Sequence, residues 1–190
     1  MILATNNAHK LVEVRRMLGE GVVEPLPQGV ELGPEIGETF AENALAKARA
    51  AAAATATVAI ADDSGICAEA LGGAPGVRSA RFAGESASDE QNLALLIERV
   101  PPGSALAYVC VVAYVDPQTS LERLFEGRCE GTMAPAPRGS GGFGYDPVFV
   151  PAGGDGRTMA QLDAAEKDAL SHRGAALRAL TAWFEEQASR

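Results

Sequence analysis

Histidine and cysteine are scarce in this sequence, which has two histidines and three cysteines among 190 residues. The cysteines, Cys67, Cys110 and Cys129, are odd in number and widely spaced, so we expect reduced thiols and no disulfide framework. The same scarcity leaves oxygen atoms as the expected ligands of a bound metal ion. Oxygen ligands favour a hard cation such as Mg²⁺.

Positive charge is also in short supply, because 16 lysines and arginines accompany 25 aspartates and glutamates, giving a formal net charge of −9. A duplex nucleic-acid binder needs a basic face to displace counterions, so this class is excluded. A small anionic substrate is compatible with the charge, since a few local cations and a divalent metal ion can neutralise it. We expect a small-molecule substrate and no nucleic acid.

Long apolar runs are missing as well, since no uncharged apolar stretch approaches the 18 residues that a membrane-spanning helix needs. The first residues, Met1 to Asn6, lack the basic start and apolar centre of a secretory signal, and we expect a cytoplasmic protein. A hydrophobic fraction of 47% with 22% charged residues is ordinary for a globular protein. We expect residues 1–190 to form a single domain.

Two adjacent carboxylates, Asp62 and Asp63, follow the apolar residues Val58 to Ala61, which read as a buried strand. In an open α/β sheet, ligands bind beyond the carboxyl ends of strands. Successive side chains of a strand point to opposite faces, so one carboxylate can serve the structure while the other faces a ligand. The alternative is a polar turn after the strand.

A turn of small polar residues, Thr5 to Lys10, lies between an expected strand over 1–5 and an expected helix over 10–18. The amide groups at such a turn and the positive end of the helix dipole suit a phosphate. Plain N-capping of the helix by Asn6 or Asn7 is the alternative interpretation.

Further elements follow from local patterns. A short strand is expected near 22–24, and Thr39 with Glu42 forms a capping box that opens an alanine-rich helix of about fifteen residues. A helix is expected over 88–99, and two β-rich segments, 106–115 and 121–129, are joined at a turn over 116–119.

A glycine-rich stretch, 139–147, forms the second dense motif, in which Phe143 can stack on a base and Asp146 can accept hydrogen bonds. A flexible hairpin loop is the alternative. Near the C-terminus, Ser171 is a candidate N-cap of the last helix. The helix dipole disfavours cations in a first turn, so His172 and Arg173 indicate a ligand or a carboxylate partner.

Taken together, five motifs in this order resemble the inosine triphosphate pyrophosphatase family. The matching segments are 5–10, 37–44, 61–65, 142–147 and 171–173, and the segments 72–76 and 79–81 also fit the family pattern. The resemblance implies an α/β fold with a long mixed central sheet flanked by helices and two lobes with a nucleotide cleft between them. It also implies a homodimer and Mg²⁺-dependent hydrolysis of dITP, ITP and XTP to the nucleoside monophosphate and pyrophosphate.

The resemblance further implies roles for particular residues. Asp63 is expected to be the general base and a metal ligand, Lys10 to stabilise phosphate charge, and Glu35 to be the second metal contact, with Glu38 its close rival. The substrate-binding residues that it implies are Thr5, Asn6, Asn7, Ala8, His9, Lys10, Ser64, Phe143, Gly144, Tyr145, Asp146, Lys167, His172 and Arg173.

The chemistry of the purine base offers an explanation of selectivity. Hypoxanthine and xanthine carry a 6-oxo acceptor where adenine carries a 6-amino donor. Arg173 only donates, so it can pair with the oxo group and would meet the adenine amino group donor to donor. Two other functions are compatible with the motifs: a pyrophosphatase for other modified nucleotides, and a non-catalytic nucleotide-binding sensor.

Overall fold

The computed structural model describes residues 1–189 and has an α/β fold, as the sequence predicts. Its helices are α1 Ala8–Leu18, α2 Phe40–Thr55, α3 Asp89–Arg99, α4 Ala164–Leu170 and α5 His172–Ala188. Its strands are β1 Ile2–Leu3, β2 Glu24–Pro25, β3 Ala59–Ala68, β4 Ala105–Asp116, β5 Leu121–Met133 and β6 Phe149–Pro151. Short 3₁₀ turns are η1 Glu69–Leu71, η2 Gly76–Arg81, η3 Asp146–Val148 and η4 Met159–Gln161.

The strands form one mixed sheet in the order β2-β1-β3-β4-β5-β6. β1 pairs parallel with β2 and β3, and β5 pairs antiparallel with β6. The expected mixed sheet with flanking helices is therefore confirmed. The chain divides into two compact units: the first contains residues 1–63, 110–127 and 173 onward, and the second contains 64–109 and 128–172.

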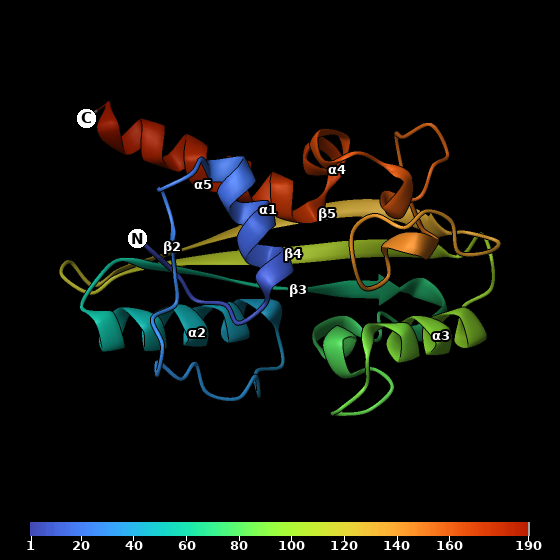
Figure 1. Ribbon diagram of the computed structural model, residues 1–190, viewed down its shortest axis with the longest axis horizontal. Coiled ribbons are helices and arrows are strands. Elements are labelled where there is room, and N and C mark those ends of the chain that lie inside the picture. The colour runs from blue at the N-terminus through green and yellow to red at the C-terminus, as the bar shows by residue number, and fades with distance from the viewer. Residues whose placement is uncertain (190) are drawn as a thin grey trace. The chain divides into compact units, whose positions relative to one another are not determined.

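In the first unit, helices cover both faces of the strands (Figure 1), with α1 and α5 on one face and α2 on the other. Alternation along β3 explains this arrangement, because Ile60 belongs to the apolar cluster with α1 and α5 whereas Ala59 and Ala61 belong to the cluster with α2. The alanines of α2 that pack on the sheet are Ala44, Ala48, Ala51 and Ala52. The small side chains let the helix lie close to the strands.

Local signals set the ends of these helices. Thr39 and Glu42 form the expected capping box at the start of α2, and Asn7 caps α1 by accepting from the amides of His9 and Lys10. The expected turn after β4 is also present, since the Asp116 side chain accepts hydrogen bonds from two later residues of the turn. The short second strand falls at Glu24–Pro25, just after the expected segment 22–24.

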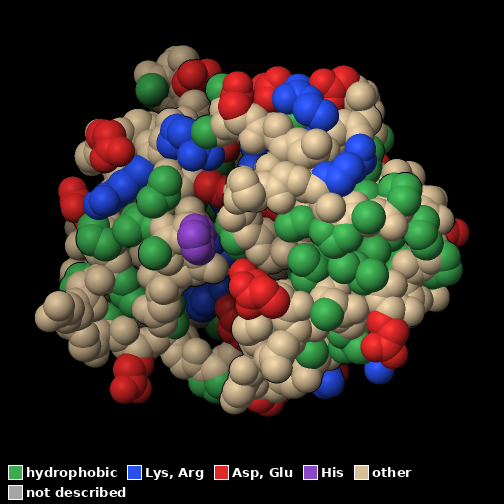
Figure 2. Space-filling model, turned by 45° about the vertical axis from the view of Figure 1, so that its right-hand side comes forward, with side chains coloured by type: hydrophobic (Ala, Val, Ile, Leu, Met, Phe, Trp, Pro, Cys, Tyr) green, Lys and Arg blue, Asp and Glu red, His purple; other side chains and the backbone are tan. Residues whose placement is uncertain are grey.

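The second unit has its own apolar core, in which Ile66, Leu96, Leu106, Phe149 and Met159 are fully or almost fully buried. This core holds α3 and the 3₁₀ turns against β3, β4 and β5 within the unit. None of the helices in residues 1–189 combines the length and hydropathy needed to cross a membrane. On the face shown in Figure 2, Lys and Arg side chains are interspersed with Asp and Glu side chains.

Candidate active site

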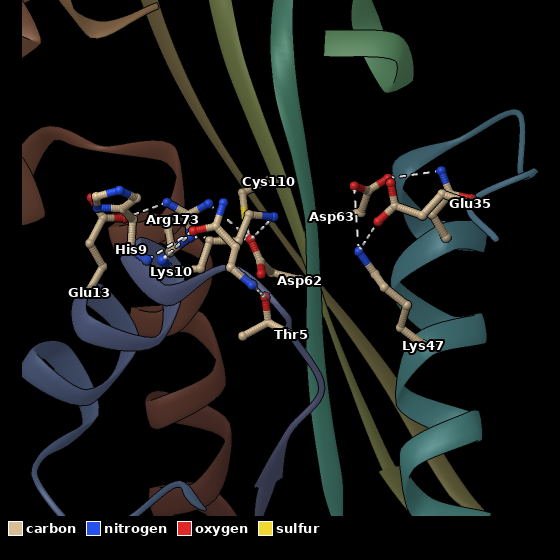
Figure 3. Close-up of polar contacts among 12 residues, drawn as sticks. Thr5, His9, Lys10, Glu13, Glu35, Lys47, Asp62, Asp63, Cys110 and Arg173 are labelled. Atoms are coloured by element: carbon tan, nitrogen blue, oxygen red, sulfur yellow. Dashed lines mark hydrogen bonds and ion pairs between the residues drawn. The ribbon is translucent and has the colours of Figure 1, made fainter. Parts of the chain in front are cut away.

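The two adjacent carboxylates lie on opposite faces of β3, as side-chain alternation predicts (Figure 3). Asp62 faces α1 and α5, and Asp63 faces α2. Both are buried, with relative exposures of 2% and 5%. The expectation that they mark the end of a strand is wrong, because β3 continues to Ala68, and the polar-turn interpretation is wrong for the same reason.

A strand does end beside the carboxylates, but it is β1. Leu3 is the last residue of β1 and pairs with Ile60 of β3, so Asp62 lies two residues beyond this pair. The turn that follows β1 thus reaches the neighbourhood of Asp62. The general rule about carboxyl ends of strands therefore makes the end of β1, and not the end of β3, the expected place for a ligand.

Asp62 is the centre of a buried ionic cluster. Its Oδ2 atom pairs with Lys10 Nζ and with Arg173 Nη2, each at 3.0 Å, and Arg173 Nη1 pairs in turn with Glu13 Oε2. Burial opposes ionisation of Asp62, but the charges of Lys10, Arg173 and Lys47 outweigh it and hold its pKa well below the usual range. Asp62 therefore acts as a permanent anion that fixes two cations.

Arg173 is surrounded by carboxylates, whereas the resemblance implies that it contacts the substrate. Its side chain is 3% exposed, and its Nε and Nη2 groups donate to Asp62 while Nη1 donates to Glu13. The expectation of a carboxylate partner for this first-turn cation is met. Pairing with a 6-oxo group would require the guanidinium to leave these two carboxylates, and the pairing stays a prediction.

The turn between β1 and α1 presents its residues at the surface, where Asn6, Asn7, Ala8 and His9 are exposed. Thr5 Oγ1 accepts from the Asn7 amide at 3.1 Å, and Asn7 Oδ1 accepts from the amides that begin α1. The N-capping interpretation is confirmed for Asn7. It is compatible with phosphate binding, since the positive end of α1 lies at the surface with Lys10 in its first turn.

Asp63 is held by two residues of α2. Asn43 Nδ2 donates to its Oδ2 atom at 3.0 Å, and Lys47 Nζ lies 3.7 Å from its Oδ1 atom. Lys47 Nζ also pairs with Glu35 Oε1 at 2.5 Å, so one ammonium group lies between two carboxylates (Figure 3). Burial, with a smaller contribution from Glu35, raises the pKa of Asp63 despite the opposing charge of Lys47.

The donor set around Asp63 suits Mg²⁺. Residues 1–189 contain no group of three or more His, Cys, Asp or Glu arranged to hold a metal ion. Mg²⁺ does not need such a group, because it commonly binds one or two carboxylates and completes its shell with water and substrate phosphates. Asp63 and the half-buried Glu35 supply two carboxylates about one ammonium, whereas Glu38 is exposed. The choice between Glu35 and Glu38 as the second metal contact stays a prediction.

Three residues of these clusters were not among the predicted site residues: Glu13, Asn43, which lies within the motif segment 37–44, and Lys47. Asn43 and Lys47 are four residues apart in an otherwise alanine-rich helix, which places both on the face toward the sheet. Two polar residues on the apolar face of a helix indicate buried polar partners, so both could have been predicted as site residues from the sequence. Glu13 likewise follows Lys10 by one turn of α1.

The glycine-rich loop of the second unit is organised by Asp146, which is 4% exposed. Its Oδ2 atom accepts from the Phe143 amide at 3.0 Å and from Lys167 Nζ at 2.7 Å, and its Oδ1 atom accepts from Tyr108 Oη at 3.1 Å. Lys167 Nζ also lies 5.0 Å from the centre of the Phe143 ring, and the His172 ring stacks on Tyr108. The loop is thus held by hydrogen bonds, and the flexible-hairpin interpretation is not supported.

The other predicted residues of this unit differ in exposure. Tyr145 is 6% exposed and lies in the core, where burial raises the pKa of its hydroxyl. Gly144 is exposed, and Ser64 is half-buried in β3 directly after Asp63. The structure thus brings Phe143, Lys167 and Tyr108 together at Asp146, with His172 stacked on Tyr108, and it turns the Tyr145 side chain inward.

We predict that Gly142→Ala destabilises the protein more than Gly144→Ala does. Both residues have a left-handed φ, +70° and +60°, so each alanine pays about 1–2 kcal/mol of backbone strain. A Cβ at Gly142 would also overlap Asp146 Oδ2, whereas a Cβ at Gly144 meets nothing within 4 Å. Overpacking adds about 1–3 kcal/mol, and thermal unfolding should show Gly142→Ala about 5 °C below its control. Equal melting temperatures would contradict the described packing.

The chain is an α/β protein whose first unit carries two oppositely facing buried carboxylates and a lysine in the N-terminal turn of α1. Its second unit carries a glycine-rich loop with an aromatic side chain beside a lysine. The Ham1 family model matches residues 1–183, and the chain belongs to the Ham1 family. The resemblance inferred from the motifs is confirmed by the relatives that follow.

Curated relatives match over nearly their whole length. The dITP/XTP pyrophosphatase of Aromatoleum aromaticum is 51% identical over 192 residues, covering 96% of this chain and 94% of that protein. The dITP/XTP pyrophosphatase of Mycobacterium tuberculosis is 48% identical, with coverages of 95% and 92%.

Solved structures are similar as well. A HAM1 protein from Coxiella burnetii gives a TM-score of 0.84 at 39% identity, covering 97% of this chain and 98% of that one. A nucleoside-triphosphatase / dITP/XTP pyrophosphatase from Mycobacterium abscessus gives 0.72 at 44% identity, with coverages of 94% and 97%.

Proposed function

We propose that this protein is a Mg²⁺-dependent pyrophosphatase that hydrolyses the non-canonical purine nucleotides dITP, ITP and XTP to the nucleoside monophosphate and pyrophosphate. The observation that carries the proposal is the buried Asp63 carboxylate, held by Asn43 and Lys47 beside a second carboxylate, Glu35. Relatives at 45–51% identity over nearly the whole chain are named dITP/XTP pyrophosphatase, which supports the substrate class.

In this proposal Asp63 accepts the proton of the attacking water. A general base works best when its pKa lies near the working pH, and the raised pKa of Asp63 moves it in that direction. The amide of Asn43 fixes the carboxylate on one oxygen. Lys47 and Lys10 provide positive charge on the two faces of β3, where it can balance the charge of a triphosphate.

Asp63 and Glu35 are the residues that would hold Mg²⁺. When bound, the ion supplies Lewis-acid polarisation of phosphate oxygens and lowers the pKa of coordinated water. The turn from Thr5 to Lys10 binds the phosphates through the positive end of α1. Asp62 keeps Lys10 in place through the ion pair between its Oδ2 atom and Lys10 Nζ.

The purine base is assigned to the loop of the second unit. Phe143 offers a ring for stacking, which does not distinguish purines, and Lys167 offers donor hydrogens to a 6-oxo acceptor. Ser64, Gly144, Tyr145, Asp146, His172 and Arg173 complete the proposed substrate-binding residues, with Tyr145 and Asp146 acting on the loop itself. We also propose that residues 1–190 act as one cytoplasmic pyrophosphatase domain that assembles as a homodimer, an assembly that analytical ultracentrifugation tests.

A panel of nucleotides tests the substrate class. With Mg²⁺, the protein should release pyrophosphate from dITP and XTP about 10- to 100-fold faster than from dATP, since a mismatched buried donor costs about 1–3 kcal/mol. Pyrophosphate and orthophosphate are measured separately, because pyrophosphate identifies cleavage between the α and β phosphates. Chelation of the metal by EDTA should abolish turnover, and added Mg²⁺ should restore it. Equal rates on dITP, dATP and dGTP would contradict the proposed selectivity.

A non-catalytic nucleotide sensor is the alternative from another class. A pure binder has no need of a buried carboxylate with a raised pKa beside Lys47. The Asp63 variant described in the Discussion separates the two functions, because only an enzyme loses turnover while its fold is retained.

A further inference from the structure

The segment from Ser79 to Asp89 contacts the glycine-rich loop at two points, although the proposed function gives the segment no role. Tyr145 Oη donates to the Ser79 carbonyl oxygen at 2.7 Å. The Gly144 amide donates to Asp89 Oδ2 at 3.2 Å. All four residues belong to the second unit.

The segment is itself firmly attached. Ser79 Oγ accepts from the Ile66 amide of β3 at 2.9 Å and donates to the Gly76 carbonyl oxygen at 2.6 Å. Asn92 of α3 accepts from the Ala83 amide and donates to the Ala80 carbonyl oxygen. Ser79 and Asn92 are 7% and 2% exposed, so the side-chain ends of these bonds are buried. A loop bonded to this segment is bonded to β3 and α3.

The bond to Asp89 bears directly on Phe143. The Phe143 amide donates a hydrogen bond to Asp146 Oδ2. The next amide along the chain, that of Gly144, donates to Asp89 Oδ2. Two consecutive peptide groups that donate to two different carboxylates have fixed orientations, and the side chain between them leaves the backbone in a fixed direction. The hydrogen bonds of the peptide groups before and after Phe143 therefore set the direction of its ring.

We propose that Asp89 is a positioning residue for base binding, which orients Phe143 by accepting the Gly144 amide. The inference rests on the proposed function, because it assigns the aimed ring to the purine base. Asp89 touches no substrate in this account and acts only through the loop backbone.

The experiment compares Asp89→Ala, Asp89→Asn and the control Glu90→Ala in the full chain. Glu90 lies in the same first turn of α3 and has the same charge, so its loss changes the helix dipole interaction in the same way. Asn at 89 keeps an oxygen that can accept the amide proton. Hydrogen exchange of the Gly144 amide by NMR reports the bond directly, and KM and kcat for dITP report its use.

We expect Asp89→Ala to raise both the exchange rate of the Gly144 amide and the KM for dITP about 10-fold, with kcat within about twofold. Asp89→Asn and Glu90→Ala should behave as the unaltered protein does. An unchanged exchange rate in Asp89→Ala would show that Asp89 does not hold the Gly144 amide. Faster exchange with an unchanged KM would show that this hydrogen bond does not contribute to base binding. The same KM change in Glu90→Ala also overturns the role, because the cause is then charge. If the unaltered protein does not hydrolyse dITP, the proposed function fails and the role fails with it, although the exchange rates still test the bond.

Discussion

Asparagine at position 63 should abolish most of the turnover and leave the fold intact. A positioned general base contributes about 10²- to 10⁴-fold to a rate, so kcat for dITP should fall by that factor in Asp63→Asn. The asparagine is isosteric and can still accept from Asn43, while Lys47 keeps Glu35 as a partner. The fold disfavours the charged form of Asp63, as its raised pKa shows, so a neutral side chain costs no stability through this effect.

The measurement is steady-state hydrolysis of dITP together with thermal unfolding, with Glu31→Gln as a control for removal of a carboxylate charge on an exposed residue. Undiminished turnover in Asp63→Asn would refute the assignment of the base.

Asparagine at position 62, in contrast to asparagine at position 63, should destabilise the fold. Asp62→Asn removes the anion that faces Lys10 and Arg173 in a buried cluster. Breaking a buried ion pair from one side costs about 3–5 kcal/mol, since it leaves uncompensated charge. For a protein of this size that loss lowers the melting temperature by about 10 °C.

The lowered pKa of Asp62 also indicates that its ionised form stabilises the folded state. Its pKa in the folded state lies below the unfolded value, so its contribution is complete above about pH 4 and is lost as the pH falls through the folded-state pKa. Thermal unfolding at pH 7 of Asp62→Asn and Asp63→Asn, measured side by side, tests the contrast. Equal melting temperatures for the two variants would show that the buried cluster does not stabilise the fold.

Much of this site could be read from local sequence. The alternation of Asp62 and Asp63 and the capping box at Thr39 follow from periods of two to four residues, and the structure has them. The length of β3 could not be read in this way. Polar residues usually end a buried strand, but here buried partners on both faces satisfy them, and those partners come from three helices.

The surroundings of Arg173 mark the limit of reading a sequence locally. Its carboxylate partners, Asp62 and Glu13, are 111 and 160 residues away in the chain. Chemistry indicated that a cation in a first helical turn needs a carboxylate or a ligand, and it could not choose between them. Asn43 and Lys47, by contrast, carried a local signal, because two polar residues interrupt the alanine face of α2 one turn apart.

The alanine face of α2 has a consequence for how this protein can vary. Asn43 has a short side chain, and it spans the gap to Asp63 only because the helix backbone lies near the sheet. A methyl group at positions such as Ala48 is therefore a spacer that sets the reach of a neighbouring amide. Larger residues there would move the amide away from the carboxylate without touching either group, so the chemistry of the site constrains the volume of side chains that take no part in it.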